Sequence, residues 1–330
     1  MRLKHKDGSR ELPGLGFGGA PIGGLLGDVD GEAATAALKT ALEGGIRYFD
    51  SAPFYGFGMS ERRIGDALRG YEDVVLSTKV GRLLKPGLPD DPASLGWPAP
   101  LPFHPVYDYS YDGVMRSYED SLQRFGLDRI DILYIHDIGP FTHTDPEEEA
   151  RHFEEAMSGG YRALEALRRS GDIAALGIGV NETEVLLRTL DRGDWDVFLL
   201  AGRYTLLEQS ALDLLFTHCA KQEVSVVVGG PFNSGILVGG STWNYAEAPP
   251  DVIERVTRIE RVCTAHGIAL PAVALQFPLA HPVVASVIPG TRTELEQREL
   301  LAWWKTDIPR GLWGDLKSEG LLDEAAPTPS

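Results

Sequence analysis

The sequence is short of cysteine, of basic residues and of long hydrophobic runs. Cys219 and Cys263 are too few for a disulfide framework and lie in helix-like segments, so we expect reduced, buried thiols in a cytoplasmic protein. Lysine and arginine number 31 against 48 acidic residues, and the net charge of −17 argues against nucleic acid or an anionic membrane as the main partner. No stretch approaches a membrane span, and residues 1–8 lack the apolar run of a signal peptide.

Metal-binding motifs are also missing. The sequence has neither H-x-H nor H-E-x-x-H, so a metal-dependent hydrolase is disfavoured and no metal is expected. A G-x-G-x-x-G match does occur at residues 14–19, but a dinucleotide fingerprint needs a helix that starts within the motif, and helical patterning begins only near Glu32. We therefore interpret these glycines as part of a strand that a ligand or another backbone approaches closely.

What the chain does contain is an alternation of apolar runs with helix-period segments, after a hairpin pattern over residues 3–12 with Asp7-Gly8 at its turn. The runs are apolar throughout, as in strands buried on both faces. About eight strand-then-helix units predict an α/β protein with a closed (β/α)₈ TIM barrel, capped by the N-terminal hairpin; an open doubly wound sheet is the fallback. The expected strands are 14–19, 46–50, 74–79, 130–136, 173–180, 197–201, 224–228 and 283–288.

The segments between the strands supply helices and two long loops. Residues 83–110, rich in proline and aromatics, are expected to be an irregular insertion, and residues 137–147 a second loop. We expect one domain over residues 1–330, with a loose tail at 323–330 that holds two prolines. The expected helices are 32–43, 60–68 (with Ser60 as N-cap), 112–125, 161–169, 182–190, 210–221, 252–266, 272–280 and 294–303.

Three consecutive strands end on polar residues, namely Asp50, Lys79 and His136, and Tyr55 follows the first of them in a Gly-flanked loop. The carboxyl ends of barrel strands face the active site, so these residues should converge. Asp50 and Lys79 are expected to form a buried ion pair whose positive charge lowers the pKa of Tyr55. Such a tyrosine exchanges a proton with a carbonyl or an alcohol, and His136 orients the substrate oxygen.

Two other interpretations of these residues compete with this one. A structural Asp–Lys pair with an incidental tyrosine and a core histidine would explain any one of them, but not four at converging positions. A Schiff-base aldolase built on Lys79 is a rival barrel chemistry, but it leaves Tyr55 unexplained.

The segments Phe49-Asp50-Ser51-Ala52-Pro53-Phe54-Tyr55-Gly56, Ser77-Thr78-Lys79 and Tyr134-Ile135-His136-Asp137 resemble the aldo-keto reductase family. The resemblance extends from residue 15 to residue 290. It implies a (β/α)₈ barrel with a nicotinamide cofactor and no metal. It also implies a catalytic tetrad in which Tyr55 is the general acid/base, Lys79 and Asp50 tune it, and His136 orients the substrate during hydride transfer.

Residues 106–112 and 200–207 resemble one branch of the family, which contains D-threo-aldose 1-dehydrogenases, L-fucose or L-galactose dehydrogenases and pyridoxal 4-dehydrogenase. This branch implies the oxidation of a cyclic hemiacetal, most simply an aldose at C1, to a lactone. Pyridoxal is the alternative substrate. A cofactor-binding regulatory subunit with little turnover is the alternative from another class, and the intact tetrad favours the enzyme.

The resemblance also assigns binding residues. NADP-specific relatives place a lysine where Gly290 stands and an arginine near Glu296, so the sequence favours NAD, with NADP left open through Arg292. The partner is a small sugar or pyridoxal, and a homo-oligomer is compatible with the sequence. The implied cofactor contacts are Asn181, Gly230, Phe232, Ser234, Gly290, Thr291 and Arg292, and the expected substrate contacts are Phe54, Trp97 and Tyr107.

Overall fold

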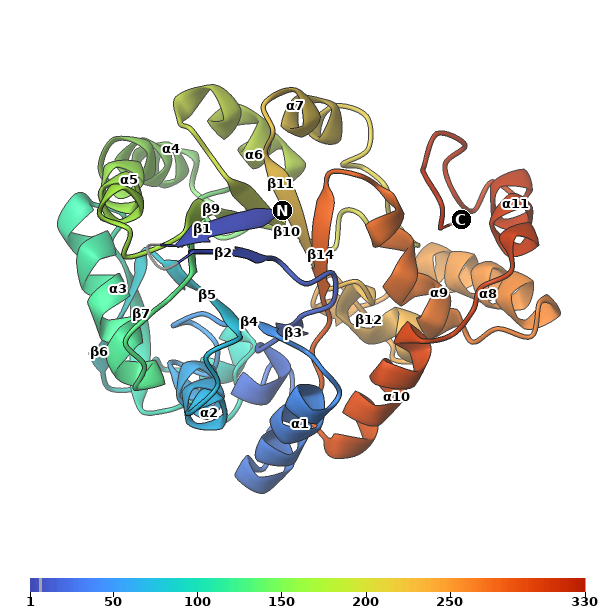
Figure 1. Ribbon diagram of the computed structural model, residues 1–330, viewed down its shortest axis with the longest axis horizontal. Coiled ribbons are helices and arrows are strands. Elements are labelled where there is room, and N and C mark those ends of the chain that lie inside the picture. The colour runs from blue at the N-terminus through green and yellow to red at the C-terminus, as the bar shows by residue number, and fades with distance from the viewer. Residues whose placement is uncertain (6–7, 330) are drawn as a thin grey trace.

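A computed structural model describes residues 1–5 and 8–329 of the chain, and its centre is a barrel of parallel strands surrounded by helices (Figure 1). Within these residues, eight strands follow the order β14-β11-β10-β9-β8-β5-β4-β3. The two outermost strands meet through a parallel bridge between Leu15 and Val287, where Gly16 N donates to Val287 O at 2.9 Å. The predicted (β/α)₈ barrel is therefore confirmed.

The barrel strands agree closely with the expected apolar runs, except that the first is shorter. At that first strand the glycines allow close packing: a Cβ on Gly16 would lie 2.6 Å from the Tyr48 ring, and one on Gly18 would lie 2.7 Å from Ile288 O. The barrel strands are β3 (Phe17–Gly18), β4 (Tyr48–Asp50), β5 (Val75–Val80), β8 (Ile132–His136), β9 (Ala175–Val180), β10 (Val197–Ala201), β11 (Ser225–Gly229) and β14 (Val284–Ile288).

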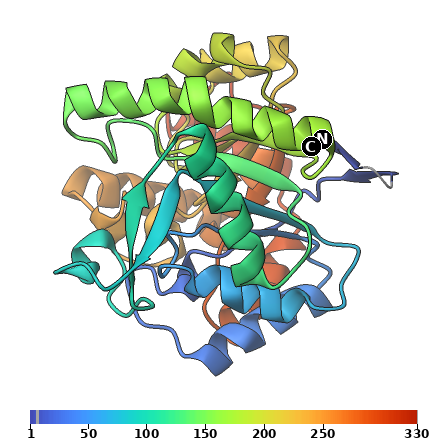
Figure 2. The ribbon, with the colours of Figure 1, turned by 90° about the vertical axis from the view of Figure 1, so that its left-hand side faces the viewer.

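The helices form the outer ring of the barrel. α4, a π-helical turn and α5 continue into one another as a long helix (Figure 2). The helices are α1 (Gly31–Glu43), α2 (Met59–Leu68), α3 (Tyr111–Phe125), α4 (Pro146–Glu155), the π turn (Ala156–Gly160), α5 (Tyr161–Ser170), α6 (Thr183–Thr189), α7 (Leu215–Lys221), α8 (Pro250–Ala265), α9 (Leu270–Gln276), α10 (Glu294–Trp304) and α11 (Arg310–Ser318).

The N-terminal hairpin lies across the amino ends of the strands (Figure 1). β1 (Arg2–His5) pairs antiparallel with β2 (Gly8–Glu11), and the predicted turn residue Asp7 lies outside the described residues. Leu3 and Leu12 are buried in the apolar cluster that fills the inside of the barrel. The predicted hairpin cap is therefore confirmed, and it closes this end of the barrel.

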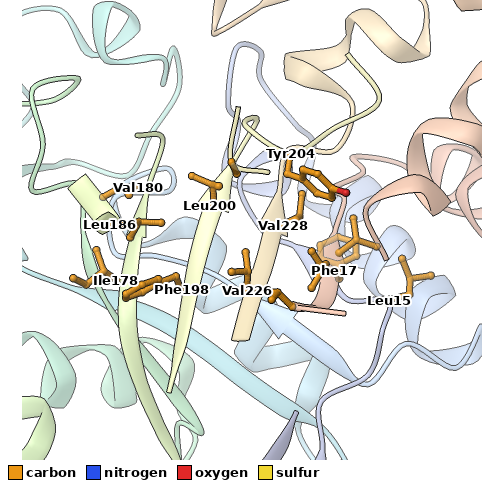
Figure 3. Packing of buried hydrophobic residues seen from close by; sticks show 14 of the residues in the cluster. Leu15, Phe17, Ile178, Val180, Leu186, Phe198, Leu200, Tyr204, Val226 and Val228 are labelled. Carbon is orange, nitrogen blue, oxygen red and sulfur yellow. The ribbon is translucent and has the colours of Figure 1, made fainter. Parts of the chain in front are cut away.

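Side chains alternate along the strands between two buried layers. The outward residues of β9, β10 and β11 pack against the helices (Figure 3). The inward residues of the same strands, such as Ala175, Val197 and Val227, belong to the inner cluster. Because successive side chains of a strand point to opposite faces, every second residue of β4, β5 and β8 also points into the barrel. Those inward positions carry Tyr48 and Asp50, Ser77 and Lys79, and Tyr134 and His136.

The region expected to be an irregular insertion is largely a β-ribbon. β6 (Arg82–Pro86) pairs antiparallel with β7 (Phe103–Tyr107), and a 3₁₀ turn lies between them. Each strand of a two-stranded ribbon has one unpaired edge, which is where proline is tolerated, so Pro86 and Pro105 do not prevent the pairing. A second, very short ribbon joins β12 (Thr242–Trp243) to β13 (Ala246–Glu247).

Three further local expectations are wrong. Gly58, with φ 96°, is the N-cap of α2, while Ser60 is buried and its hydroxyl donates to Gly19 O at 2.8 Å. The chain continues after α10 into α11, which was not expected. The tail is not loose, because Ala326 is buried and Lys317 Nζ donates to the carbonyls of Glu324 and Ala326, both at 2.8 Å.

In the described part of the chain, no single helix is long and apolar enough to cross a membrane. One helix pair, Pro250–Ala265 with Leu270–Ala280, reaches that length and hydropathy together, but it is bent by 100°. Cys219 and Cys263 are buried and free, in α7 and α8, as predicted.

Gly65 should be indispensable to the packing of α2 on α3. A Cβ there would collide with the carbonyl oxygen of Phe125, whereas a Cβ on Gly314 of α11 would meet no atom of the described residues within 4 Å. We expect Gly65→Ala to lower the free energy of unfolding by about 1–3 kcal/mol. Gly314→Ala, the control, should raise it by about 0.5–1 kcal/mol. Urea denaturation measures both, and unchanged stability of Gly65→Ala would contradict the packing described.

Candidate active site

The strand-end residues Asp50 and Lys79 form a buried ion pair inside the barrel. The register of β4, β5 and β8 places them on neighbouring strands, and Lys79 Nζ lies 2.7 Å from Asp50 Oδ2. The same ammonium donates to Ser51 O at 2.8 Å. Both side chains are at most 2 % exposed, so the pair is shielded from water. The structure thus brings together the two residues as the sequence predicts.

A polar layer beneath this pair was not anticipated. Ser77 Oγ donates to Asp50 Oδ1 at 2.7 Å, and the Tyr48 hydroxyl lies 3.0 Å from Ser77 Oγ and 3.3 Å from the Tyr134 hydroxyl. Burial raises the pKa of Asp50, and the contacts with Lys79 and Ser77 oppose that rise. The sequence contained a signal for this layer. Tyr48, Ser77 and Tyr134 each stand two positions before a strand-end residue, and therefore on the same inward face of the strand.

Tyr55 lies beside the ion pair, on the loop after β4. Lys79 Nζ is 4.8 Å from the centroid of its ring, and the His136 ring centroid is 6.0 Å away at an angle of 81°. The loop is tight at Gly56, which has φ 62° and on which a Cβ would collide with Gly23 O. Asp50, Lys79, Tyr55 and His136 therefore meet at one side of the carboxyl-terminal rim.

The expected lowering of the pKa of Tyr55 is wrong for this state of the protein. Burial raises the pKa of Tyr55 well above its ordinary value, and the Asp50 carboxylate raises it further, while Arg82 opposes the rise. The charge of Lys79 does not prevail because Asp50 neutralises it at 2.7 Å. The phenol is consequently a proton donor at neutral pH in this state.

His136 is held as a neutral imidazole next to two residues that the sequence did not single out. Burial, Arg82 and Lys79 lower the pKa of His136 well below its ordinary value. Its Nε2 lies 3.3 Å from Asp137 Oδ2, which also accepts a hydrogen bond from Arg82 Nη2 at 2.6 Å. Asp137 directly follows the strand-end histidine, so its position alone could have flagged it, whereas Arg82 begins β6, whose pairing with β7 the sequence did not indicate.

A cavity of about 300 Å³ opens from Asp50 and Tyr55 along the carboxyl ends of β10, β11 and β14. Thr291, which was predicted to bind the cofactor, instead is buried and donates to Gln297 Oε1 at 2.8 Å. The other six predicted cofactor residues line the cavity: Asn181, Gly230, Phe232, Ser234, Gly290 and Arg292.

The cavity wall fits a nicotinamide dinucleotide. Its loop after β11 turns sharply through three residues with positive φ, Asn233, Ser234 and Gly235, and all three line the cavity. At the same wall the Nε of Arg292 is buried and has no hydrogen-bond partner among the described residues, which suits an anionic oxygen. Asn181 and Tyr55 also line this cavity.

The ribbon of β12 and β13 covers part of this cavity. Its turn residue Tyr245 accepts a hydrogen bond from Asn181 Nδ2 at 3.2 Å, and its backbone N donates to Ser234 Oγ at 3.1 Å. Both partners are predicted cofactor residues. Sequence reasoning missed Tyr245 because the ribbon is only two residues long on each side.

The three predicted substrate residues are placed differently. The Phe54 ring lies 4.0 Å below the Arg82 guanidinium and 5.5 Å from the Trp97 ring, and Trp97 packs on Tyr55 at 5.7 Å. Both therefore adjoin the tetrad. Tyr107 lies farther out, with its ring 4.6 Å from that of His143.

The sequence profile of the Aldo/keto reductase family matches residues 14–318, and the chain belongs to this family. It is 44 % identical to pyridoxal 4-dehydrogenase from Microbacterium luteolum, covering 93 % of this chain and 94 % of that protein. It is 36 % identical to D-threo-aldose 1-dehydrogenase from a Pseudomonas species, covering 96 % of each chain.

Solved structures support the fold. An aldo-keto reductase from Bacillus halodurans in its holo form superposes with a TM-score of 0.71 at 24 % identity, covering 99 % of this chain and 97 % of that one. The family, the barrel and the assignment as an oxidoreductase are thus as the sequence predicts, and the family uses nicotinamide cofactors.

Removing one half of the buried ion pair should be costly. Lys79→Met leaves the Asp50 carboxylate buried without its cation, so we expect the free energy of unfolding to fall by about 3–5 kcal/mol. The double variant Lys79→Met/Asp50→Asn, which also removes the buried carboxylate, should recover part of the lost free energy of unfolding. Arg298→Met, which breaks an exposed pair with Glu294 on α10, should change it by at most about 1 kcal/mol. Urea denaturation of the wild type and the three variants is the measurement, and equal losses for Lys79→Met and Arg298→Met would contradict the cost of an unpaired buried carboxylate.

Proposed function

We propose that this protein is an NAD-dependent dehydrogenase that oxidises a cyclic hemiacetal to a lactone. The observation that carries the proposal is the position of Tyr55, which lines the cofactor-sized cavity and adjoins the Asp50–Lys79 pair and neutral His136. We further propose that residues 1–330 act as one unit on small molecules in the cytoplasm, which the free, buried cysteines support.

The proposed roles follow from the arrangement of the site. The phenolate that Tyr55 forms as the pH rises takes the hydroxyl proton of the hemiacetal while the C–H hydride leaves, so that the C–O bond becomes a carbonyl. Neutral His136 hydrogen-bonds the reacting oxygen. Lys79, fixed by Asp50, provides the cation nearest the Tyr55 ring. The bound cofactor supplies the hydride acceptor.

Two substrates are candidates. Pyridoxal carries a hydroxymethyl group next to its aldehyde and closes into an internal hemiacetal, so it undergoes the same chemistry as an aldose. The sequence alone put an aldose first, but the 44 % identity to a pyridoxal 4-dehydrogenase puts pyridoxal first, and the packed rings of Phe54 and Trp97 beside Tyr55 are compatible with an aromatic substrate. The 36 % identity to an aldose dehydrogenase keeps the sugar as the second candidate.

Initial rates of NAD and NADP reduction with pyridoxal, L-fucose, L-galactose and D-arabinose test the proposal. We expect turnover of pyridoxal with NAD. If only a sugar is oxidised, the proposed substrate changes from pyridoxal to that sugar, and the proposed roles of the catalytic residues stay the same. Cofactor binding without turnover of any of the four would favour the regulatory subunit.

Replacement of Tyr55 by phenylalanine should abolish turnover by about 10²–10⁴-fold and leave cofactor binding almost unchanged, because only the proton acceptor is lost. Since the pKa of Tyr55 is raised, the phenolate becomes available only as the pH rises. The wild-type oxidation rate should therefore increase with pH through the alkaline range, while the reverse reaction, which uses the protonated phenol, should change little over the same range. Stopped-flow rates over pH 6–10 provide the check, and a Tyr55→Phe enzyme with wild-type turnover would disprove the assignment.

The proposed preference for NAD rests on the residues at the end of the cavity that would hold the adenosine. Glu296 lines the wall and its Oε2 accepts from Arg292 N at 2.6 Å, while Arg292 Nη2 donates to Leu25 O at 2.7 Å. A side chain on Gly290 would collide with Gly18 O. A 2′-phosphate would therefore meet a carboxylate, and the lysine of NADP-specific relatives has no room here.

Neutralising this carboxylate should widen the cofactor range. Glu296→Gln keeps an oxygen that accepts from Arg292 N but removes the negative charge. We expect kcat/KM for NADP to rise roughly tenfold, equivalent to about 1.4 kcal/mol, with little change for NAD. Steady-state kinetics with both cofactors decide the matter, and an unchanged NADP/NAD ratio would count against repulsion by Glu296.

A further inference from the structure

Two buried histidines and a glutamate lie close together outside the catalytic tetrad, between the loop after β8 and helix α4. His143 belongs to the loop, whereas Glu148 and His152 stand four residues apart on α4 and therefore on one side of it. One nitrogen of each imidazole and one carboxylate oxygen all lie within 4.8 Å of one another. The histidines are 3 % and 7 % exposed, but the Glu148 side chain is 47 % exposed, so the group is open to solvent on the glutamate side.

The loop histidine is held in one tautomer by Tyr109. The Tyr109 hydroxyl has a single hydrogen, and it faces the carbonyls of His136 and Asp137 at 2.9 and 3.1 Å, which only accept. Towards His143 Nε2, at 3.2 Å, the hydroxyl is therefore an acceptor, and Nε2 carries the ring proton. Burial is the main cause that lowers the pKa of His143 to about 4. The imidazole is thus neutral at pH 7 and keeps a lone pair on Nδ1, as a metal ligand requires.

The helix histidine offers its lone pair in the same way. Arg151 Nη2 lies 3.4 Å from His152 Nε2 and 3.5 Å from Glu148 Oε1. A guanidinium only donates, so Nε2 is the acceptor nitrogen and Nδ1 carries the proton. Nδ1 is buried without a hydrogen-bond partner among the described residues, and Glu155 Oε2 is 3.5 Å away. A metal-bound histidine usually directs its second N–H to such a carboxylate, which fixes the ring.

The spacing of these atoms fits a metal ion. His152 Nε2 lies 3.5 Å from Glu148 Oε1, and two ligands bound to one Zn²⁺ in tetrahedral geometry lie about 3.3–3.5 Å apart. Arg151 Nη2 faces both atoms, but its side chain is 68 % exposed, so it is free to turn into solvent as an ion enters. The half-exposed carboxylate gives the ion a path to the two imidazoles.

We propose that His143, Glu148 and His152 form a binding site for a divalent transition metal, with Zn²⁺ as the best fit, which ties the loop after β8 to α4. Two imidazoles and one carboxylate suit Zn²⁺ rather than Mg²⁺ or Ca²⁺, which prefer oxygen ligands only. The inference does not depend on the proposed function. The spacing H-x₄-E-x₃-H spans a loop and a helix, so a search for H-x-H and H-E-x-x-H did not detect it.

Calorimetric titration of Zn²⁺ into the untagged, EDTA-treated full chain is the test. We expect one Zn²⁺ per chain. Glu148→Gln and His152→Gln should each weaken binding by more than about 10-fold, because loss of a group behind a ligand already costs about 10–100-fold. The control His266→Gln removes a histidine that is paired with Asp315 at 2.7 Å at the end of α8, and it should bind Zn²⁺ like the wild type.

Removal of the competing guanidinium gives a change in the opposite direction. Arg151→Ala should tighten Zn²⁺ binding by up to about five-fold, the equivalent of one exposed ion pair. Zn²⁺ should also raise the midpoint of thermal unfolding of the wild type and of His266→Gln, because it binds the folded chain. The midpoint of Glu148→Gln should stay unchanged.

The site is refuted if the wild type binds no Zn²⁺, or if Glu148→Gln binds it as tightly as His266→Gln does. Weakened binding in Glu148→Gln and His152→Gln, with His266→Gln unaffected, supports the site. If His152→Gln does not fold, Glu148→Gln decides alone, since the glutamate side chain is half-exposed and its replacement leaves the buried imidazoles in place.

Discussion

The buried pair of Lys79 and Asp50 is the contact on which the rest of the site depends. Two charges removed from water are costly unless their hydrogen-bonding groups are satisfied. Here Ser77 and the Ser51 carbonyl supply those partners, at 2.7 and 2.8 Å. The pair joins β4 to β5 at the rim, and so it sets where the Tyr55 loop leaves the barrel. Because Lys79 Nζ donates to both Asp50 and the Ser51 carbonyl, this nitrogen is already engaged, which argues against the Schiff-base chemistry considered from the sequence.

The tetrad could be predicted because its positions follow from one local rule. In a barrel the strand ends share a rim, so Asp50, Lys79 and His136 could be placed together without any knowledge of distant contacts. Arg82 and Tyr245 could not. Arg82 begins a ribbon that forms only because its strand pairs with residues 17 to 25 positions away, and Tyr245 sits on a turn too short to leave a pattern. Pairing between distant segments has no signature in local composition.

The difference between local patterns and contacts with distant segments also explains the individual predictions that were wrong. Ser60 has the chemistry of an N-cap, but its hydroxyl is used in a contact with Gly19 from another part of the chain. The tail has a composition typical of disorder, but Lys317 holds two of its carbonyls. The pKa of Tyr55 depends on the depth of burial and on whether Asp50 offsets Lys79, which proximity in the sequence does not reveal. The types of the barrel elements were predictable, whereas the contacts of Ser60 and Lys317 with distant segments were not.

The N-terminal hairpin, which closes the amino end of the barrel, has a consequence for the order in which ligands bind. Because Leu3 and Leu12 join the inner cluster at the amino end, the cavity beside Tyr55 opens at the carboxyl ends of the strands. If a cofactor and a substrate both approach Tyr55 from that side, the one that lies deeper has to bind first and leave last. The closed amino end of the barrel therefore favours an ordered sequence of binding.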